Sequence, residues 1–147
     1  MGVPPLSTKL FLCYFCAMTK NEAQLAQFEK TVNNLKEVLN RLKVPGPDYA
    51  VFRDSAIQRF EIAFDVCWKT LKEKLRQEYG VEAISPKKVF QESFKQGLIE
   101  NDAVWISMTD MRNETSHAYN EQFAEKVVLE LPNIQMALEQ LLWKLKR

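Results

Sequence analysis

The polar segment from Asp110 to Asn120 carries the residue types best suited to chemistry in this chain. Within it, the guanidinium of Arg112 can hold a phosphate through two parallel hydrogen bonds and stabilise charge that develops on phosphorus. The imidazole of His117, with an unperturbed pKa of about 6.5, can take a proton from a ribose 2′-hydroxyl or give one to a leaving oxygen. The chemistry that these two residue types could perform together is phosphodiester cleavage without a metal ion.

The spacing of these residues sets conditions on that chemistry. Arg112 and His117 are five residues apart, which on a continuous helix means about 140° of rotation, so they converge only if the helix ends or turns between them. Asn113 is four residues before His117 and shares its helix face, where it could orient the imidazole or contact a phosphate. One histidine cannot easily perform both proton transfers, which favours a symmetric homodimer with two facing copies. On spacing alone, an arginine and a histidine near a helix end are more often a cap and a surface cation than a catalytic pair.

Other catalytic and metal-binding patterns are absent from the sequence. There is no phosphate-binding glycine loop, no dinucleotide-binding fingerprint and no nucleophile elbow. A single histidine excludes a two-histidine metal site within one chain, so we expect no metal and no cofactor of its own. Cys13 and Cys16 form a C-x-x-C pair without the βαβ context or second ligand pair that a redox or metal site needs. With Cys67 they make an odd, sparse set, which is typical of a reducing, cytoplasmic setting.

The charge balance limits how the chain could bind nucleic acid. It has 20 basic and 19 acidic residues among 147, for a formal net charge of +1. A broad electrostatic grip on nucleic acid normally needs a strongly basic face. Binding to RNA would therefore come from a local patch or from the pairing of two copies.

The first twenty residues differ from the rest of the chain. Leu10–Met18 is a continuous apolar run of nine residues, far shorter than the ~20 needed to span a bilayer, and no A-x-A cleavage pattern follows it. The simplest interpretation takes Met18 as the true start and residues 1–17 as an upstream extension. We therefore predict an N-terminal extension over 1–20, one domain over 21–147 and no membrane association.

Apolar residues at helical spacing predict helices throughout the domain. A stripe from Leu25 to Leu42 marks a first amphipathic helix that ends before Pro45-Gly46-Pro47. This stripe could serve the core or pair with another protomer. An aromatic-rich second helix is expected at about 50–79, with Gly80 as its C-terminal cap.

Three further helices follow, and no segment has the pattern of a long strand. Ser85-Pro86 begins a helix over 87–96 whose Val89, Phe90 and Phe94 should face inward. A fourth helix is expected to have Asp102 as its cap. A fifth, over 121–146, contains Pro132, which should kink it or split it. The predicted fold class is all-α, an up-and-down bundle of four to five antiparallel helices.

The polar segment also resembles a known family. The run Arg112-Asn113-Glu114-Thr115-Ser116-His117 fits the HEPN signature, and Tyr119 extends it to the R-x4-H-x-Y form of HepT-like toxins, the nucleotidyltransferase substrate-binding protein family. Further matches in the same order are Arg59-Phe60-Glu61, Trp68-Lys69-Thr70-Leu71, Ser85-Pro86-Lys87, Gly97-Leu98-Ile99 and Trp105. The resemblance covers roughly residues 21–142.

The resemblance implies a HEPN-like bundle that forms a homodimer, with two motifs lining a shared cleft, and RNA cleavage by Arg112 and His117. It implies a cognate minimal nucleotidyltransferase antitoxin that transfers AMP from ATP to Tyr119. A charged adenylyl group there would fill the cleft and repel RNA phosphate. A packed tyrosine ring with its hydroxyl at the surface would also suit that position. Glu61 matches a family position and could point towards Arg112, which would supply the partner that a buried carboxylate needs.

A second hypothesis comes from a different functional class. The bundle could be a non-catalytic subunit that presents Tyr119 or a nucleotide pocket to the nucleotidyltransferase, with Arg112 and His117 only binding an anion. This alternative predicts tight complex formation and ATP-dependent modification, but no RNA cleavage by the protein alone. The near-neutral charge mildly favours it over avid RNA binding.

Overall fold

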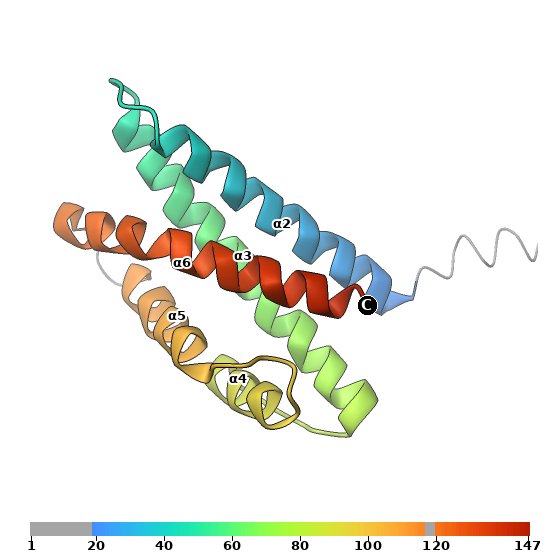
Figure 1. Ribbon diagram of the computed structural model, residues 1–147. Helices are drawn as coiled ribbons and strands as arrows, with labels where there is room; N and C mark the ends of the chain where they lie inside the picture. Colours follow the sequence, from blue (N-terminus) through green and yellow to red (C-terminus); the bar gives the residue numbers. More distant parts are fainter. Residues whose placement is uncertain (1–18, 117–119) are drawn as a thin grey trace, which may run out of the picture.

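Five α-helices make up most of the part of the chain that the structure describes, residues 19–116 and 120–147, in a computed structural model (Figure 1). No strand occurs in these two ranges. The predicted all-α class is therefore confirmed. The helices are α2 (Lys20–Leu42), α3 (Tyr49–Tyr79), α4 (Pro86–Lys95), α5 (Asp102–Thr115) and α6 (Glu121–Leu145).

Local sequence signals explain where the helices begin and end. Thr19 caps α2 in a reciprocal arrangement with Glu22, in which each side chain accepts a hydrogen bond from the backbone N–H of the other residue. Gly80 ends α3 with φ of 64°, a left-handed conformation that glycine adopts without steric cost. The Ser85 hydroxyl accepts from the Lys88 N–H at the start of α4. These ends match the breaker and capping residues in the sequence.

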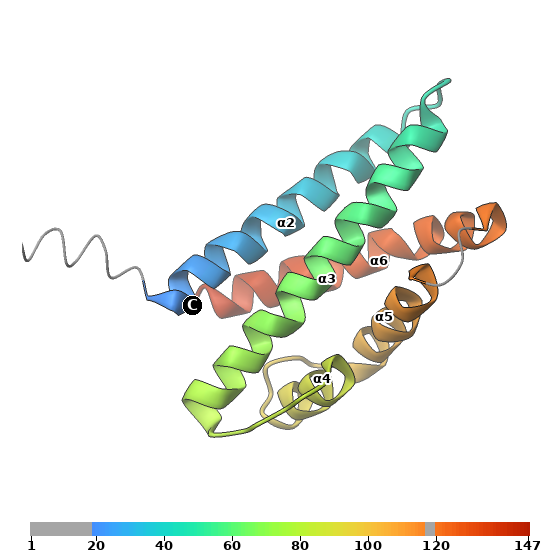
Figure 2. The ribbon, with the colours of Figure 1, turned by 180° about the vertical axis from the view of Figure 1, so that it is seen from behind.

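Apart from short α4, successive helices alternate in direction, as the views from both sides show (Figures 1 and 2). α2 and α3 form a long antiparallel hairpin, and α6 lies across both of them. α5 runs antiparallel to α3, and short α4 packs beside it against the second half of α3. The up-and-down bundle is confirmed.

A row of aromatic rings in the core fixes α4 and α5 against α3. Phe60 and Phe64 of α3 have ring centroids 6.3 Å apart, Phe64 lies 5.8 Å from Phe90 of α4, and Phe90 lies 5.3 Å from Trp105 of α5. All four residues are buried. Burying each such ring contributes on the order of 2–3 kcal/mol, before any contribution from ring geometry. The row therefore sets where the rest of α5 lies along α3.

Two local predictions were wrong. Asn101, not Asp102, caps α5, because its extended backbone lets its side-chain oxygen accept the Ala103 N–H at 2.9 Å. Asp102 is instead the first helical residue, where its charge meets the positive end of the helix dipole. Phe94 does not face inward but is 45% exposed, because Ser93 takes the buried position in the last turn of short α4.

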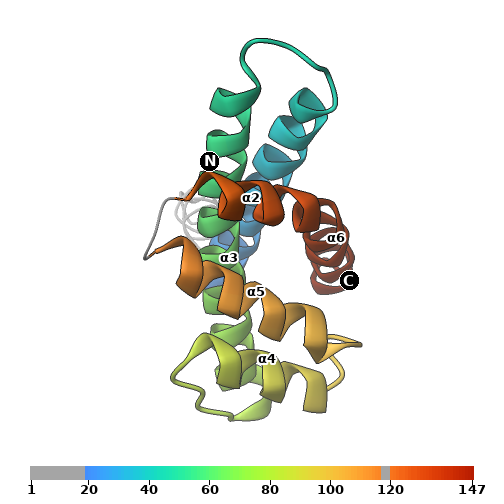
Figure 3. The same cartoon turned by 90° about the vertical axis from the view of Figure 1, so that its left-hand side faces the viewer.

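Pro132 kinks α6 without splitting it. The helix is continuous from Glu121 to Leu145, and Figure 3 shows its orange first half and dark red second half running in different directions. Proline cannot donate to the carbonyl of Val128, so the helix bends where that bond is missing. Within the described ranges, no helix combines the length and apolar character needed to cross a membrane.

Candidate functional site

Arg112 is positioned by the buried face of α5. Trp105, Met108 and Thr109 are the buried residues of this helix. Arg112 follows them by seven, four and three residues, so it continues the same face. It lies beyond the end of the aromatic row, and its side chain is 24% exposed. The buried face of α5 thus places the Arg112 guanidinium against the surface of α3.

Two carboxylates of α3 lie beside this guanidinium. Arg112 Nη1 is 3.7 Å from Glu61 Oε1, and Arg112 Nη2 is 3.6 Å from Asp65 Oδ2. Arg112 Nη1 also donates to the hydroxyl of Ser116, which in turn donates to the Arg112 carbonyl at 3.1 Å. Both carboxylate distances are those of ion pairs longer than hydrogen bonds. One positive and two negative charges therefore meet at the end of α5.

One N–H donor of the Arg112 guanidinium has no hydrogen-bond acceptor among the described residues. Arg112 Nε is buried, and no acceptor for it lies among residues 19–116 and 120–147. Arginine carries five N–H donors in a planar fork, and a buried donor without an acceptor costs roughly 1–3 kcal/mol. An oxyanion that reached this edge would satisfy a donor that the rest of the described protein leaves open.

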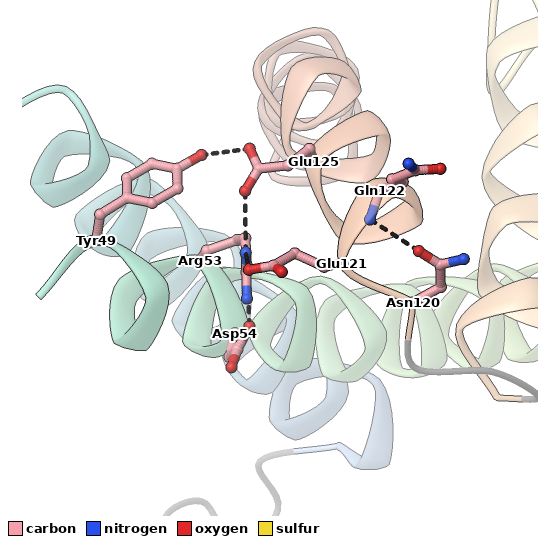
Figure 4. Close-up of polar contacts among 7 residues, drawn as sticks. All are labelled: Tyr49, Arg53, Asp54, Asn120, Glu121, Gln122 and Glu125. Atoms are coloured by element: carbon pink, nitrogen blue, oxygen red, sulfur yellow. Dashed lines mark hydrogen bonds and ion pairs between the residues drawn. The ribbon is translucent and has the colours of Figure 1, made fainter.

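A second arginine ties the start of α6 to α3 (Figure 4). Arg53, only 4% exposed, donates from Nη1 to Glu125 Oε1 at 3.0 Å and to Glu121 Oε1 at 3.2 Å. Its Nε donates to Asp54 Oδ1 at 3.1 Å. The hydroxyl of Tyr49 donates to the other oxygen of Glu125 at 2.6 Å. A buried charge is thus satisfied by carboxylates that are themselves partly in water.

This network also changes the protonation equilibria of its members. The hydrogen bond from Tyr49, followed by that from Arg53, lowers the pKa of Glu125 below its ordinary value. The same hydrogen bond to Glu125 raises the pKa of Tyr49. Both shifts favour an ionised carboxylate and a neutral phenol, which keeps the contact intact at neutral pH.

The two arginine clusters hold both ends of the segment between α5 and α6. On α3, Asp65 follows Glu61 by four residues on the same face, and Arg53 lies eight residues before Glu61, about two turns away and about 80° round the helix. Asn120, whose side chain accepts the Gln122 N–H at 2.9 Å, caps α6 directly after this segment. The side of α3 between the clusters is therefore the described wall of the candidate site.

The predicted site residues have different outcomes. Arg112 and Glu61 lie together, with Glu61 half-buried rather than enclosed. Asn113 is exposed on α5. α5 ends at Thr115, so a helix end does fall between Arg112 and residue 117. His117 and Tyr119 lie outside the described residues, so their predicted roles stay predictions.

Sequence reasoning missed Asp65 and Arg53. Asp65 had a usable signal, because it lies four residues after Glu61 on the predicted second helix and hence on the same face. The contact of Arg53 with α6 had no such signal, since its partners on that helix, Glu121 and Glu125, are 68 and 72 residues away.

Two other features of the surface bear on cofactors. In the two described ranges, no three His, Cys, Asp or Glu side chains are grouped as a metal site would require. A cavity of about 590 Å³ lies between the α4–α5 connection and the second half of α6, lined by Leu98, Trp105 and Trp143 among others. Arg112 does not line it, so it is separate from the polar cluster.

Comparison with protein families gives a match over most of the chain. The model of the family described as nucleotidyltransferase substrate binding protein like matches residues 23–147. A probable ribonuclease HepT from Haemophilus influenzae is 30% identical over 96 residues, which are 63% of this chain and 66% of that protein. The match thus spans slightly less than two thirds of that relative's length.

Two solved structures share the fold. A protein from Thermus thermophilus superposes with a TM-score of 0.74 at 39% identity, over 82% of this chain and 99% of its own. A Haemophilus influenzae protein described as a substrate binding domain of a nucleotidyltransferase gives a TM-score of 0.76 over 84% of this chain and 99% of its own. Its identity of 24% makes that likeness one of fold alone.

Proposed function

Since the chain belongs to the family of nucleotidyltransferase substrate-binding-like proteins, we propose that it is the partner subunit of a minimal nucleotidyltransferase and a metal-independent ribonuclease. In this proposal Arg112 and His117 are its catalytic residues, and the pair with the nucleotidyltransferase is a toxin–antitoxin system. The similarity to a probable ribonuclease supports the activity. The family description supports the partner.

The placement of Arg112 is the observation that carries the proposal. Its guanidinium is held at the end of α5 by α3 and Ser116, while Nε has no acceptor among the described residues. A core arginine would be fully paired, and a surface arginine would have a hydrated Nε. An arginine held in place with an open donor suits a group that receives a phosphate.

The proposed reaction is an internal transesterification of RNA. The ribose 2′-oxygen attacks the adjacent phosphorus while His117 takes its proton. The bond from phosphorus to the 5′-oxygen breaks, and that oxygen receives a proton from the second copy's histidine. The products are a 2′,3′-cyclic phosphate and a 5′-hydroxyl. Arg112 stabilises the extra negative charge on the phosphoryl oxygens. A homodimer supplies both histidines.

Control of this activity is proposed to come from the nucleotidyltransferase. The Tyr119 phenol oxygen attacks the α-phosphorus of ATP bound by that partner, and pyrophosphate leaves. The product carries one adenylyl group two residues from His117. Its negative phosphate repels RNA phosphate, and its bulk fills the site. The phenol is then the only group of this chain that changes.

The test is cleavage of single-stranded RNA by the purified protein in EDTA. We expect His117→Ala and Arg112→Ala each to lower the rate by about 10²-fold or more, since general acid–base groups contribute about 10²–10⁴-fold. The matched control is Glu114→Ala, at an exposed position of the same segment, which should stay within twofold. Unchanged cleavage by His117→Ala, with native circular dichroism, would remove that residue from the mechanism.

One observation favours a second candidate function, a non-catalytic docking subunit. Glu61 and Asp65 give the Arg112 cluster a net negative charge, which opposes RNA binding. In that case the nucleotidyltransferase and ATP would still adenylylate Tyr119, and Tyr119→Phe would prevent it, but no variant would cleave RNA. Intact-mass spectrometry of the ATP-treated complex, run beside the cleavage assay, separates the two functions.

A further inference from the structure

We propose that Asp65 is a positioning residue, which holds the Arg112 guanidinium against α3 and competes with phosphate for one edge of it. This inference rests on the anion-binding role proposed for Arg112. It adds a residue of α3 that the sequence motif does not include. Removing the charge of a residue that supports an anion site usually weakens anion binding, whereas removing the charge of Asp65 should strengthen it.

The geometry points to one edge of the guanidinium. A phosphate binds arginine best through two parallel N–H groups, on either the Nε–Nη2 edge or the Nη1–Nη2 edge. Nη1 already donates to Ser116 and faces Glu61. Nε has no acceptor in the described ranges, and Nη2 faces Asp65. A phosphate on the Nε–Nη2 edge therefore competes with one acceptor among the described residues, Asp65, and must also displace the atoms that bury Nε.

Charge and exposure distinguish Asp65 from Glu61. Both carboxylates repel a phosphate on the same guanidinium. The Asp65 side chain is 43% exposed, so it can turn into water when the anion arrives, whereas that of Glu61 is 28% exposed. Without an anion, Asp65 keeps the guanidinium oriented towards α3. Its presence thus costs affinity for phosphate but fixes the direction from which phosphate is received.

Inorganic phosphate is the direct probe. In ¹⁵N-labelled protein, the Arg112 Nε–H signal, assigned by its loss in Arg112→Lys, is followed during a phosphate titration. We expect Asp65→Asn to bind phosphate roughly three- to tenfold more tightly at low salt, as the removal of one nearby unit charge predicts. The gain should shrink at high salt because the site is partly exposed. Asp65→Glu retains the charge and should stay within twofold of the unaltered protein.

The control removes the same charge from a neighbouring position. Asp110 is exposed on α5, two residues before Arg112 and hence on another side of the helix, so Asp110→Asn should leave phosphate binding within twofold. Asp65→Ser serves as a second neutral variant should Asp65→Asn fold poorly. With RNA as substrate, Asp65→Asn should lower KM severalfold and also lower kcat, because the guanidinium is bound more readily but oriented less well.

Each result decides the inference. Phosphate binding by both neutral variants that is no tighter than in Asp110→Asn would overturn it. If Asp65→Asn binds phosphate more tightly while no variant cleaves RNA, the role of Asp65 stands and the ribonuclease proposal fails. If Arg112→Ala loses cleavage but the neutral Asp65 variants bind phosphate no more tightly than the unaltered protein, the role of Asp65 is wrong and the ribonuclease proposal stands.

Discussion

Replacing Arg53 by methionine tests the anchor that ties the start of α6 to α3. The substitution removes the charge-assisted hydrogen bonds to Glu121, Glu125 and Asp54, but keeps an apolar side chain in the buried position. Breaking a fully buried ion pair costs about 3–5 kcal/mol. Here the carboxylates are 43–77% exposed, so water replaces much of what they lose, and Tyr49 still donates to Glu125. We therefore expect a loss of about 2 kcal/mol.

The assay is urea unfolding of Arg53→Met beside Arg59→Met. Arg59 lies on the same helix and donates to the Asn34 carbonyl at 2.6 Å, but its side chain is 35% exposed. Its replacement should cost less than about 1 kcal/mol, as expected for surface pairs. Hydrogen exchange in the first turns of α6 should accelerate in Arg53→Met alone. Equal losses in the two variants would refute the reasoning that the Arg53 network is the stronger anchor.

Three further predictions concern stability and reactivity. Gly80→Ala should cost about 1 kcal/mol in urea unfolding, because φ is 64° there, whereas Gly46→Ala should cost less; equal costs would contradict this. The thiol of Cys67 is fully buried and its pKa is raised by that burial, so in a variant with the other cysteines changed to serine a thiol reagent should react only after unfolding. Hydrogen bonds from Tyr49 and Arg53 lower the pKa of Glu125 in the folded state. The contribution of Glu125 to the free energy of unfolding is therefore present above its unfolded pKa of about 4.3 and is lost as the pH falls through its lower folded pKa. Acid should therefore lower the free energy of unfolding of Glu125→Gln less than that of the unaltered protein, as measured by urea unfolding.

The sequence predicted the helices well because their boundaries depend on near neighbours. Pro45-Gly46-Pro47, Gly80 and Ser85-Pro86 act within a few residues, and the structure places helix ends at each of them. The predicted N-cap of the fourth helix was wrong by one residue, because Asn and Asp are both good capping residues and the backbone angles decide which of Asn101 and Asp102 is the cap.

The candidate site was only partly predictable, because it depends on contacts between distant segments. The pairing of Glu61 with Arg112 was anticipated from a family position and not from any local pattern. The Asp65 and Arg53 contacts require the relative placement of α3, α5 and α6, which the aromatic core sets. Periodicity shows which face of a helix is buried, but not which residue of another helix it meets.

The central claim is that the Arg112 guanidinium and the His117 imidazole act on the same phosphate. The most direct test is a crystal structure of the full chain with a short RNA whose 2′-hydroxyl at the cleavage site is replaced by hydrogen. We expect one phosphate that accepts hydrogen bonds from Arg112, with a His117 imidazole from either copy facing the 2′-carbon or within hydrogen-bonding distance of the 5′-oxygen. A phosphate bound by Arg112 with both copies' imidazoles on the opposite side of the bundle would contradict it.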